Sequence, residues 1–419
     1  MSSAKTVAAS RKNECARLQN YGTLKQGGGI SENNMLNTIL FDVDGVFLSE
    51  ERYFDASALT VRELLLSRNY LGLGGDGAFQ TSYSNEEITD IRKRVFLQDK
   101  VLHFLKSRGM NANWDMIYVT FSAQLIDLIA SLPDEPRKEA AAFLRTSIGR
   151  NTLGQLKAIF KAYPKRPDFS RFLTDFSATD ATKQELISYL NTLADRRLGI
   201  RTYAFHPKST LWHVGEHASQ EWYVGDENVL SATGEPPVQT GKRGFMNDEV
   251  TLVAPDHVRR LFRNLRSAGI RIGIATGRPH LETYRPFAYL HWLELLDDEH
   301  IATADDVLAA ERAYNAAPLA KPHPFTYLLA YYGKQSDIRP LTVREPDKLA
   351  HGADTLIVGD SPADLLCARQ IGCLFAAVLT GLSGKQARSE FESLGADFIL
   401  DSVADVAKLV RDLRKKHSV

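Results

Sequence analysis

Short apolar runs alternate with amphipathic stretches through much of the second half of the chain. The stretch that begins at Pro255 has apolar residues at intervals of three and four, which predicts a helix with one buried face. The apolar positions of this helix are Val258, Leu261, Phe262 and Leu265. Further helices are predicted at 280–290, 304–314 and 363–371. Short apolar runs predict strands at 38–41, 270–275, 300–303, 355–358, 374–379 and 398–400.

This alternation of strand and helix is typical of an α/β fold with a parallel, doubly wound sheet. Right-handed crossovers join parallel strands, so we expect helices on both faces of the sheet. The strand at 38–41 is separated from the rest by about 200 residues, so a large segment is inserted after the first strand of the core.

The inserted segment has mainly helical patterns, punctuated by proline-rich and glycine-rich loops. Its predicted helices lie at 86–108, 116–131, 137–147, 151–162 and 182–196. We therefore predict a polar N-terminal extension at 1–35, an α/β core at 36–47 and 249–419, and a helical domain at 48–248. Because the insertion follows the first strand directly, we expect it to lie over the core as a cap.

Composition narrows the class of protein. The 419 residues are 44% hydrophobic, and 51 Lys and Arg balance 51 Asp and Glu, so no overall basic charge favours nucleic acid. No apolar run approaches the roughly 18 residues that a membrane helix needs. The three cysteines, Cys15, Cys367 and Cys373, form no CxxC pair, which favours a reducing cytoplasm, with the last two buried as free thiols. The sequence leaves the oligomeric state open.

The first strand ends in Asp42-Val-Asp44-Gly45, which is the most informative stretch of the chain. Residues two apart share one face of a strand, so the two carboxylates would lie together. Carboxylates this close repel unless a cation or a proton lies between them. Because open α/β sheets bind ligands at the carboxyl ends of their strands, this stretch predicts a metal or proton-transfer site there.

Three further elements follow in order along the core. They are Thr276-Gly277-Arg278, Lys321-Pro322-His323-Pro324, and Gly359-Asp360-Ser361-Pro362-Ala363-Asp364. The first and last come directly after predicted strands. Each element alone is also typical of an ordinary turn or helix start, but their conjunction with the Asp-x-Asp strand points to one site.

Together the acidic residues suit phosphoryl transfer. A nucleophilic carboxylate, here Asp42, can accept a phosphoryl group as an aspartyl phosphate. The carboxylates of Asp42 and Asp360 and the backbone oxygen of Asp44 are hard ligands of the kind that Mg²⁺ prefers. The side chain of Asp44 is left for general acid–base work, and Asp364 would orient the site or add a metal ligand.

The remaining residues suit phosphate binding. Thr276 offers a hydroxyl and Gly277 a backbone N–H to phosphoryl oxygens. Lys321 offers a positive charge that would stabilise the charge built up during transfer. Arg278, next to the phosphate-binding pair, is a candidate contact to substrate or cap, with a structural ion pair as the alternative.

These four elements resemble the four motifs of the haloacid dehalogenase-like hydrolase superfamily, in particular its phosphoglycolate phosphatase and β-phosphoglucomutase type. The resemblance covers residues 38–48 and about 250–405. It implies a Rossmannoid core, obligatory Mg²⁺, Asp42 as nucleophile and Asp44 as acid and base. It also implies Thr276 and Lys321 as phosphate binders. The acidic metal motif would be Asp360 with Asp364. The insertion occupies the position of the helical cap but is far longer than usual.

The leading hypothesis is therefore a Mg²⁺-dependent phosphatase acting on a small phosphorylated metabolite. A phosphomutase would share the same core residues, and a catalytically idle binding or scaffold protein is the alternative from another class. A binding module has no need of five such residues, namely Asp42, Asp44, Thr276, Lys321 and Asp360. The sequence does not indicate the substrate, because the cap would select the leaving group.

Overall fold

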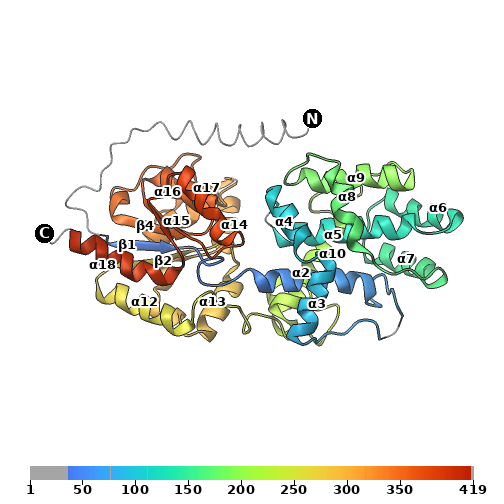
Figure 1. Ribbon diagram of the computed structural model, residues 1–419, viewed down its shortest axis with the longest axis horizontal. Coiled ribbons are helices and arrows are strands. Elements are labelled where there is room, and N and C mark those ends of the chain that lie inside the picture. Colours follow the sequence, from blue (N-terminus) through green and yellow to red (C-terminus); the bar gives the residue numbers. More distant parts are fainter. Residues whose placement is uncertain (1–35, 76, 111, 317, 417–419) are drawn as a thin grey trace. The chain divides into compact units, whose positions relative to one another are not determined.

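The computed structural model describes residues 36–75, 77–110, 112–316 and 318–416 (Figure 1). The predicted N-terminal extension lies outside the described residues. The described chain forms two compact units. Residues 36–50 and 246–416 make up the sheet unit, and Glu51–Phe245 make up the helical unit.

The sheet unit contains a parallel sheet of six strands in the order β3-β2-β1-β4-β5-β6. The strands are β1 (Thr38–Phe41), β2 (Arg271–Ala275), β3 (Ile301–Ala302), β4 (Thr355–Gly359), β5 (Leu374–Val378) and β6 (Phe398–Leu400). This confirms the predicted α/β fold class. The first strand, β1, lies between β2 and β4, and its Phe41 pairs with Ile274 and with Val358.

Helices cover both faces of this sheet, as predicted (Figure 1). Successive strand residues point to opposite faces, so Phe41 belongs with Phe262 to one core and Leu40 belongs with Leu365 to the other. The first core includes α12 (Pro255–Ser267), α13 (His280–Tyr289) and α18 (Val406–Lys416). The second includes α14 (Ala304–Tyr314), α15 (Phe325–Tyr332), α16 (Pro362–Ile371) and α17 (Arg388–Ser393).

The described residues of the helical unit form helices and connecting loops. Its α-helices are α2 (Glu51–Leu66), α3 (Asn85–Val95), α4 (Lys100–Ser107), α5 (Asn113–Ala130), α6 (Asp134–Ala142), α7 (Arg150–Ala162), α8 (Phe172–Ser177), α9 (Glu185–Leu198), α10 (Thr210–Val224) and α11 (Asp226–Thr233). The single helix predicted at 86–108 is wrong. Leu97, Gln98 and Asp99 all have positive φ angles, and this left-handed backbone separates α3 from α4.

A buried ionic cluster joins distant parts of the helical unit. The Lys242 ammonium lies 2.7 Å from a carboxylate oxygen of Glu63 and 2.6 Å from one of Glu221, and all three side chains are fully buried. The Trp222 indole N–H also donates to Glu63, at 2.7 Å. Burial raises the pKa of Glu63 to about 7, although Lys242 opposes this shift. The cluster therefore connects α2, α10 and the loop that follows α11.

The cysteines and the hydropathy of the helices can be compared with the expectations from composition. Cys367 and Cys373 are buried free thiols, as predicted. Among the described helices, none is both long enough and apolar enough to cross a membrane.

Candidate active site

Three of the predicted site residues lie where three neighbouring strands end. Asp42 directly follows β1, and its backbone N–H donates to the Val358 carbonyl of β4 at 3.0 Å. Gly45 has a φ of 71°, a conformation that glycine adopts without steric cost, and here the chain turns back on itself. Asp360 follows β4 directly, and Thr276 follows β2 directly. Strand pairing thus brings three of the four sequence elements to one edge of the sheet.

Asp42 has one bound and one available carboxylate oxygen. Its Oδ1 accepts the Val43 backbone N–H at 2.8 Å and lies 2.9 Å from the Lys321 ammonium. Among the described residues, nothing donates a hydrogen bond to Oδ2. Burial raises the pKa of Asp42 to about 7, Lys321 opposes the shift, and Asp364 adds to it. An available oxygen suits a nucleophile, and the raised pKa indicates that the ionised form needs a further positive charge.

Asp360 lies in a slot between two glycines. A Cβ atom at Gly45 would lie 2.1 Å from Asp360 Oδ2, and one at Gly381 would lie 2.0 Å from the same oxygen. The Thr380 hydroxyl donates to the Gly45 carbonyl and so ties the two glycine segments together. Within the described part of the chain, no side-chain or backbone donor binds the Asp360 carboxylate. The slot therefore holds a carboxylate whose oxygens are free to bind a ligand.

These carboxylates fit a divalent cation. Asp42, Asp360 and Asp364 each offer an oxygen, and the three oxygens lie within 4.8 Å of one another. Burial, together with the charges of Asp364 and Asp42, raises the pKa of Asp360 well above its usual range. Three carboxylates against the single ammonium of Lys321 leave excess negative charge in a buried place. A hard cation with oxygen ligands would balance that charge.

Asp364 differs from the other two because protein donors already surround it. It lies 2.9 Å from the Lys321 ammonium, and the Ser361 hydroxyl and backbone N–H donate to its Oδ2 at 2.6 and 3.2 Å. Burial opposes ionisation of Asp364, but Lys321 and these hydrogen bonds hold its pKa below the usual range. Lys321 in turn has a raised pKa because Asp364 and Asp42 outweigh the effect of burial. Lys321 and Asp364 are therefore a charged pair.

Asp44 belongs to a second ionic group on the same edge. Two guanidinium nitrogens of Arg278 donate to Asp44 Oδ1, at 2.9 and 2.6 Å. The same guanidinium pairs with Glu249, and the side chains of Arg278 and Glu249 are only 1% and 2% exposed. Arg278 thus makes the ion pair that the sequence offered as an alternative to substrate contact. Its phosphate-binding role stays a prediction.

Thr276 and Gly277 lie at the end of β2. The Thr276 hydroxyl accepts the Arg278 backbone N–H at 3.1 Å, and its side chain is buried. Gly277 is exposed, and no atom lies within 4 Å of where its Cβ would be. Open space beside this exposed glycine is compatible with phosphate binding, which stays a prediction for both residues.

The structure thus groups the predicted residues into two sets. Asp42, Lys321, Asp360 and Asp364 form one cluster, and Asp44 with Arg278 forms another. Sequence reasoning missed Glu249, Tyr327 and Gly381. Tyr327 donates its hydroxyl to Asp364 Oδ1 at 2.8 Å. Only Gly381 had a sequence signal, because a glycine just after a predicted strand can mark a close approach of the backbone to another group.

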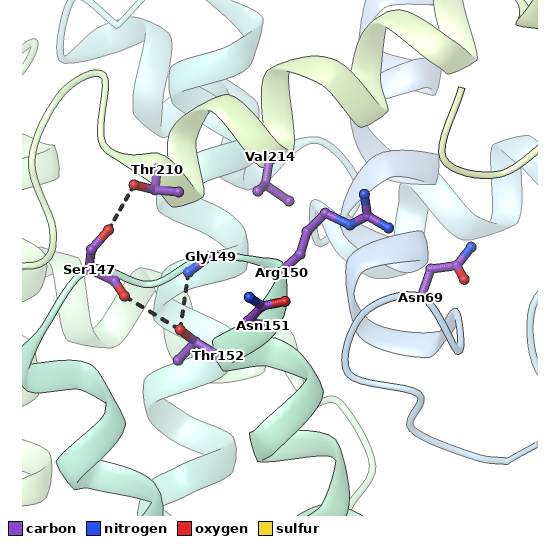
Figure 2. A pocket seen from close by; sticks show the side chains of 8 residues that line it. All are labelled: Asn69, Ser147, Gly149, Arg150, Asn151, Thr152, Thr210 and Val214. Carbon is purple, nitrogen blue, oxygen red and sulfur yellow. Dashed lines mark hydrogen bonds between the residues drawn. The ribbon is translucent and has the colours of Figure 1, made fainter. Parts of the chain in front are cut away.

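A separate cavity of about 800 Å³ lies in the helical unit (Figure 2). Its lining residues are Asn69, Ser147, Gly149, Arg150, Asn151, Thr152, Thr210 and Val214. The Ser147 and Thr210 hydroxyls lie 2.7 Å apart, and Figure 2 shows the hydrogen bond between them. None of the predicted site residues lines this cavity, and it holds no pair of carboxylates. The chemistry of the site therefore resides in the sheet unit.

Comparisons with known proteins agree with this architecture. A family model described as HAD-hydrolase-like matches residues 318–406. An X-ray structure solved as a Northeast Structural Genomics Consortium target is 37% identical to this chain. That similarity covers 91% of this chain and 100% of the other, with a TM-score of 0.81. The name of that structure states no activity.

Two more distant structures have low TM-scores. A phosphonoacetaldehyde hydrolase-like protein from Oleispira antarctica is 9% identical, with 91% of this chain and 94% of that chain covered and a TM-score of 0.39. The L-2-haloacid dehalogenase from Xanthobacter autotrophicus is 13% identical, with 90% and 99% covered and a TM-score of 0.34. None of the curated proteins compared with this chain matches it.

Proposed function

This chain belongs to the haloacid dehalogenase-like hydrolase superfamily, and from that premise we propose that it is a Mg²⁺-dependent phosphatase. Its substrate would be a small phosphorylated metabolite, hydrolysed through an aspartyl phosphate on Asp42. The observation that carries the proposal is the cluster of Asp42, Asp360 and Asp364 with Lys321 at the end of the central strands. We also propose a cytoplasmic location, which the buried free thiols of Cys367 and Cys373 support.

In the first step, an oxygen of Asp42 attacks the phosphorus atom and the bond from phosphorus to the leaving oxygen breaks. The carboxyl group of Asp44 gives its proton to that leaving oxygen. In the second step, Asp44 takes a proton from a water molecule, whose oxygen attacks phosphorus and breaks the bond to Asp42. Inorganic phosphate leaves, and both carboxyl groups return to their starting states.

Lys321 and Arg278 support these two steps. The Lys321 ammonium is already 2.9 Å from Asp42, so it is placed to offset negative charge on the phosphoryl group as that group is transferred. Arg278 holds Asp44 through two hydrogen bonds and so fixes the direction of proton transfer. Thr276 and Gly277 would bind the phosphoryl oxygens.

Asp42 and Asp360, with the backbone oxygen of Asp44, would hold Mg²⁺. When bound, the ion would supply positive charge that offsets the negative charge of the phosphoryl group. In this proposal Asp364 orients Lys321, because its own oxygens already accept protein donors. The slot formed by Gly45 and Gly381 keeps Asp360 in place for the ion.

We assign the helical unit the role of a cap that selects the leaving group. The support is its place in the chain, since it begins at Glu51, seven residues after Asp44, and ends at Phe245, before β2. Its size, about 200 residues, is the main departure from the family type that the sequence resembles.

A phosphate-release screen over sugar phosphates, nucleotides, phosphoglycolate and pyrophosphate tests the proposal. We expect at least one of these classes to be hydrolysed. EDTA should remove that activity, and Mg²⁺ should restore it. Asp42→Asn is the blank, because an amide lacks the charge for attack but has almost the same shape.

Three results would contradict the proposal. They are release of phosphate by Asp42→Asn at the wild-type rate, hydrolysis that resists EDTA, and no release from any member of the panel. Conversion of a sugar phosphate to its isomer without sustained phosphate release would instead indicate a phosphomutase with the same core.

A further inference from the structure

We propose that Tyr327 is a positioning residue of this site, whose hydroxyl holds the Lys321 ammonium beside Asp42 by way of Asp364. The inference rests on the proposed phosphatase function and adds a residue that none of the four sequence elements contains. Tyr327 lies on α15, and its side chain is fully buried. It does not touch the transferred group, so its effect would pass through Lys321 and Asp364.

The Tyr327 hydroxyl has a partner on each side. It donates to Asp364 Oδ1 at 2.8 Å and accepts from the Lys321 ammonium at 3.3 Å. The ammonium also lies 4.7 Å from the centre of the Tyr327 ring, within the range of a cation–π contact. One side chain therefore contacts both members of the Lys321–Asp364 pair.

The hydroxyl completes the set of donors around Asp364. An ionised carboxylate offers about four acceptor positions, two on each oxygen. The Ser361 hydroxyl and backbone N–H occupy Oδ2, while Lys321 and Tyr327 occupy Oδ1. With both oxygens occupied, the carboxylate cannot rotate without losing a hydrogen bond in a buried place. Tyr327 thus supplies the donor that makes Asp364 a fixed anchor for the lysine.

The hydroxyl also completes the set of acceptors around Lys321. An ammonium has three N–H donors, and three oxygens surround this one. Those of Asp42 and Asp364 are both at 2.9 Å, whereas the Tyr327 oxygen is at 3.3 Å. The longest of these hydrogen bonds is the weakest, so the proton directed at Tyr327 can turn to a phosphoryl oxygen at the least cost. The hydroxyl therefore holds the ammonium in place while leaving it able to bind substrate.

Tyr327→Phe isolates this role, because it removes the hydroxyl but keeps the buried ring and its contact with the ammonium. Tyr331→Phe is the matched control. Tyr331 lies one turn further along α15 and is only half-buried, and the described residues provide no hydrogen-bond partner for its hydroxyl. Both variants and the wild type are purified as full chains and compared by melting temperature, which separates a fold defect from a positioning defect.

Three measurements follow on each protein. They are kcat and KM with an aryl phosphate, the inhibition constant of orthovanadate, and the Mg²⁺ dissociation constant from calorimetry. We expect Tyr327→Phe to lower kcat by about tenfold or more, because a displacement near 1 Å at a reacting group can cost about a hundredfold. Orthovanadate resembles the phosphoryl group in transfer, so its inhibition constant should rise by a similar factor. KM and the Mg²⁺ constant should change by less than about twofold, since the hydrogen bonds of the Tyr327 hydroxyl go to Lys321 and Asp364 and not to Asp42 or Asp360.

A purely structural role would instead lower the melting temperature and leave kcat and orthovanadate inhibition unchanged in the folded variant. That result would overturn the inference while leaving the phosphatase intact. Equal loss of kcat in Tyr331→Phe would also overturn it. If the wild type releases no phosphate from any substrate, the proposed function fails first and the inference fails with it.

Discussion

Replacing Gly381 by alanine tests whether Asp360 is held for a metal ion. The added methyl group would lie 2.0 Å from Asp360 Oδ2 and 2.9 Å from its carboxyl carbon, closer than real Cβ atoms approach such neighbours. The backbone at Gly381 is not left-handed, so alanine is not strained there, and the clash is the main effect. Gly45 blocks a second side of the same oxygen.

The size of the effect follows from these distances. Since Cβ contacts shorter than 3.0 Å are essentially never seen, the carboxylate oxygen must move by about 1 Å. Magnesium–oxygen bonds are about 2.0–2.1 Å long and tolerate little deviation, so a displaced oxygen no longer reaches the ion. We expect the Mg²⁺ dissociation constant of Gly381→Ala to rise by about 10–100-fold, which corresponds to about 1.4–2.7 kcal/mol.

Isothermal titration calorimetry of the full chain with Mg²⁺ measures this constant directly, with circular dichroism to confirm the fold. Gly154→Ala is the control, because Gly154 lies inside α7 and has no atom within 4 Å of its Cβ position. That variant should gain about 0.5–1 kcal/mol of stability and bind Mg²⁺ like the wild type. A folded Gly381→Ala protein whose Mg²⁺ constant stays within about twofold of the wild type would refute the reasoning.

Three further predictions concern other parts of the molecule. Arg278→Met should lower kcat for alkyl phosphates about tenfold more than for aryl phosphates, because a poor leaving group depends more on the proton from Asp44; equal losses for both substrates would show that Arg278 does not orient Asp44. Lys242→Met should lower the free energy of unfolding by about 3–5 kcal/mol at about pH 8, since Glu63 and Glu221 lose their buried cation. Burial already raises the pKa of Glu63 to about 7, and a carboxyl group with a raised folded pKa stabilises the fold at low pH and loses that contribution as the pH rises. Without Lys242 the pKa of Glu63 rises further, so the loss in the free energy of unfolding, measured by urea denaturation, should be smaller at about pH 5 than at about pH 8. A loss that does not change with pH would contradict this prediction. Removal of Mg²⁺ by EDTA should lower the melting temperature of the wild type more than that of Gly381→Ala, and equal shifts would argue against binding of the ion at Asp360.

The sheet could be predicted well because its strands are covered on both faces. Such strands are continuous apolar runs with few alternatives, and all six predicted strands are present among the described residues. The short β3 strand (Ile301–Ala302) was found because it lies between two clear helical patterns. Local sequence therefore carried most of the information about this unit.

The helical unit was predicted less well because its polar residues are not all exposed. The helix α2 was missed, and its Asp55 and Glu63 are buried with partners that lie far away in the sequence. A polar residue with a distant partner breaks the apolar pattern that marks a buried helix face. The break between α3 and α4 has no glycine or proline to signal it, since Leu97, Gln98 and Asp99 take up the left-handed backbone.

The residues of the candidate site also differ in how well the sequence predicted them. Residues that directly follow strands, such as Asp42 and Asp360, could be placed together because neighbouring parallel strands end at one edge. The side chains that pair with the site residues could not be placed from the sequence. Glu249 and Tyr327 reach Arg278 and Asp364 only through the packing of separate elements, which a motif does not reveal.

The central claim is that Asp42 carries the phosphoryl group during turnover. It is tested most directly by mixing the full chain with Mg²⁺ and an aryl phosphate, quenching in acid, and mapping phosphorylated peptides by mass spectrometry. We predict one acid-stable phosphoryl group on the peptide that contains Asp42, absent from Asp42→Asn. Steady phosphate release with no phosphoryl group on Asp42, or with the group on another residue, would contradict the account.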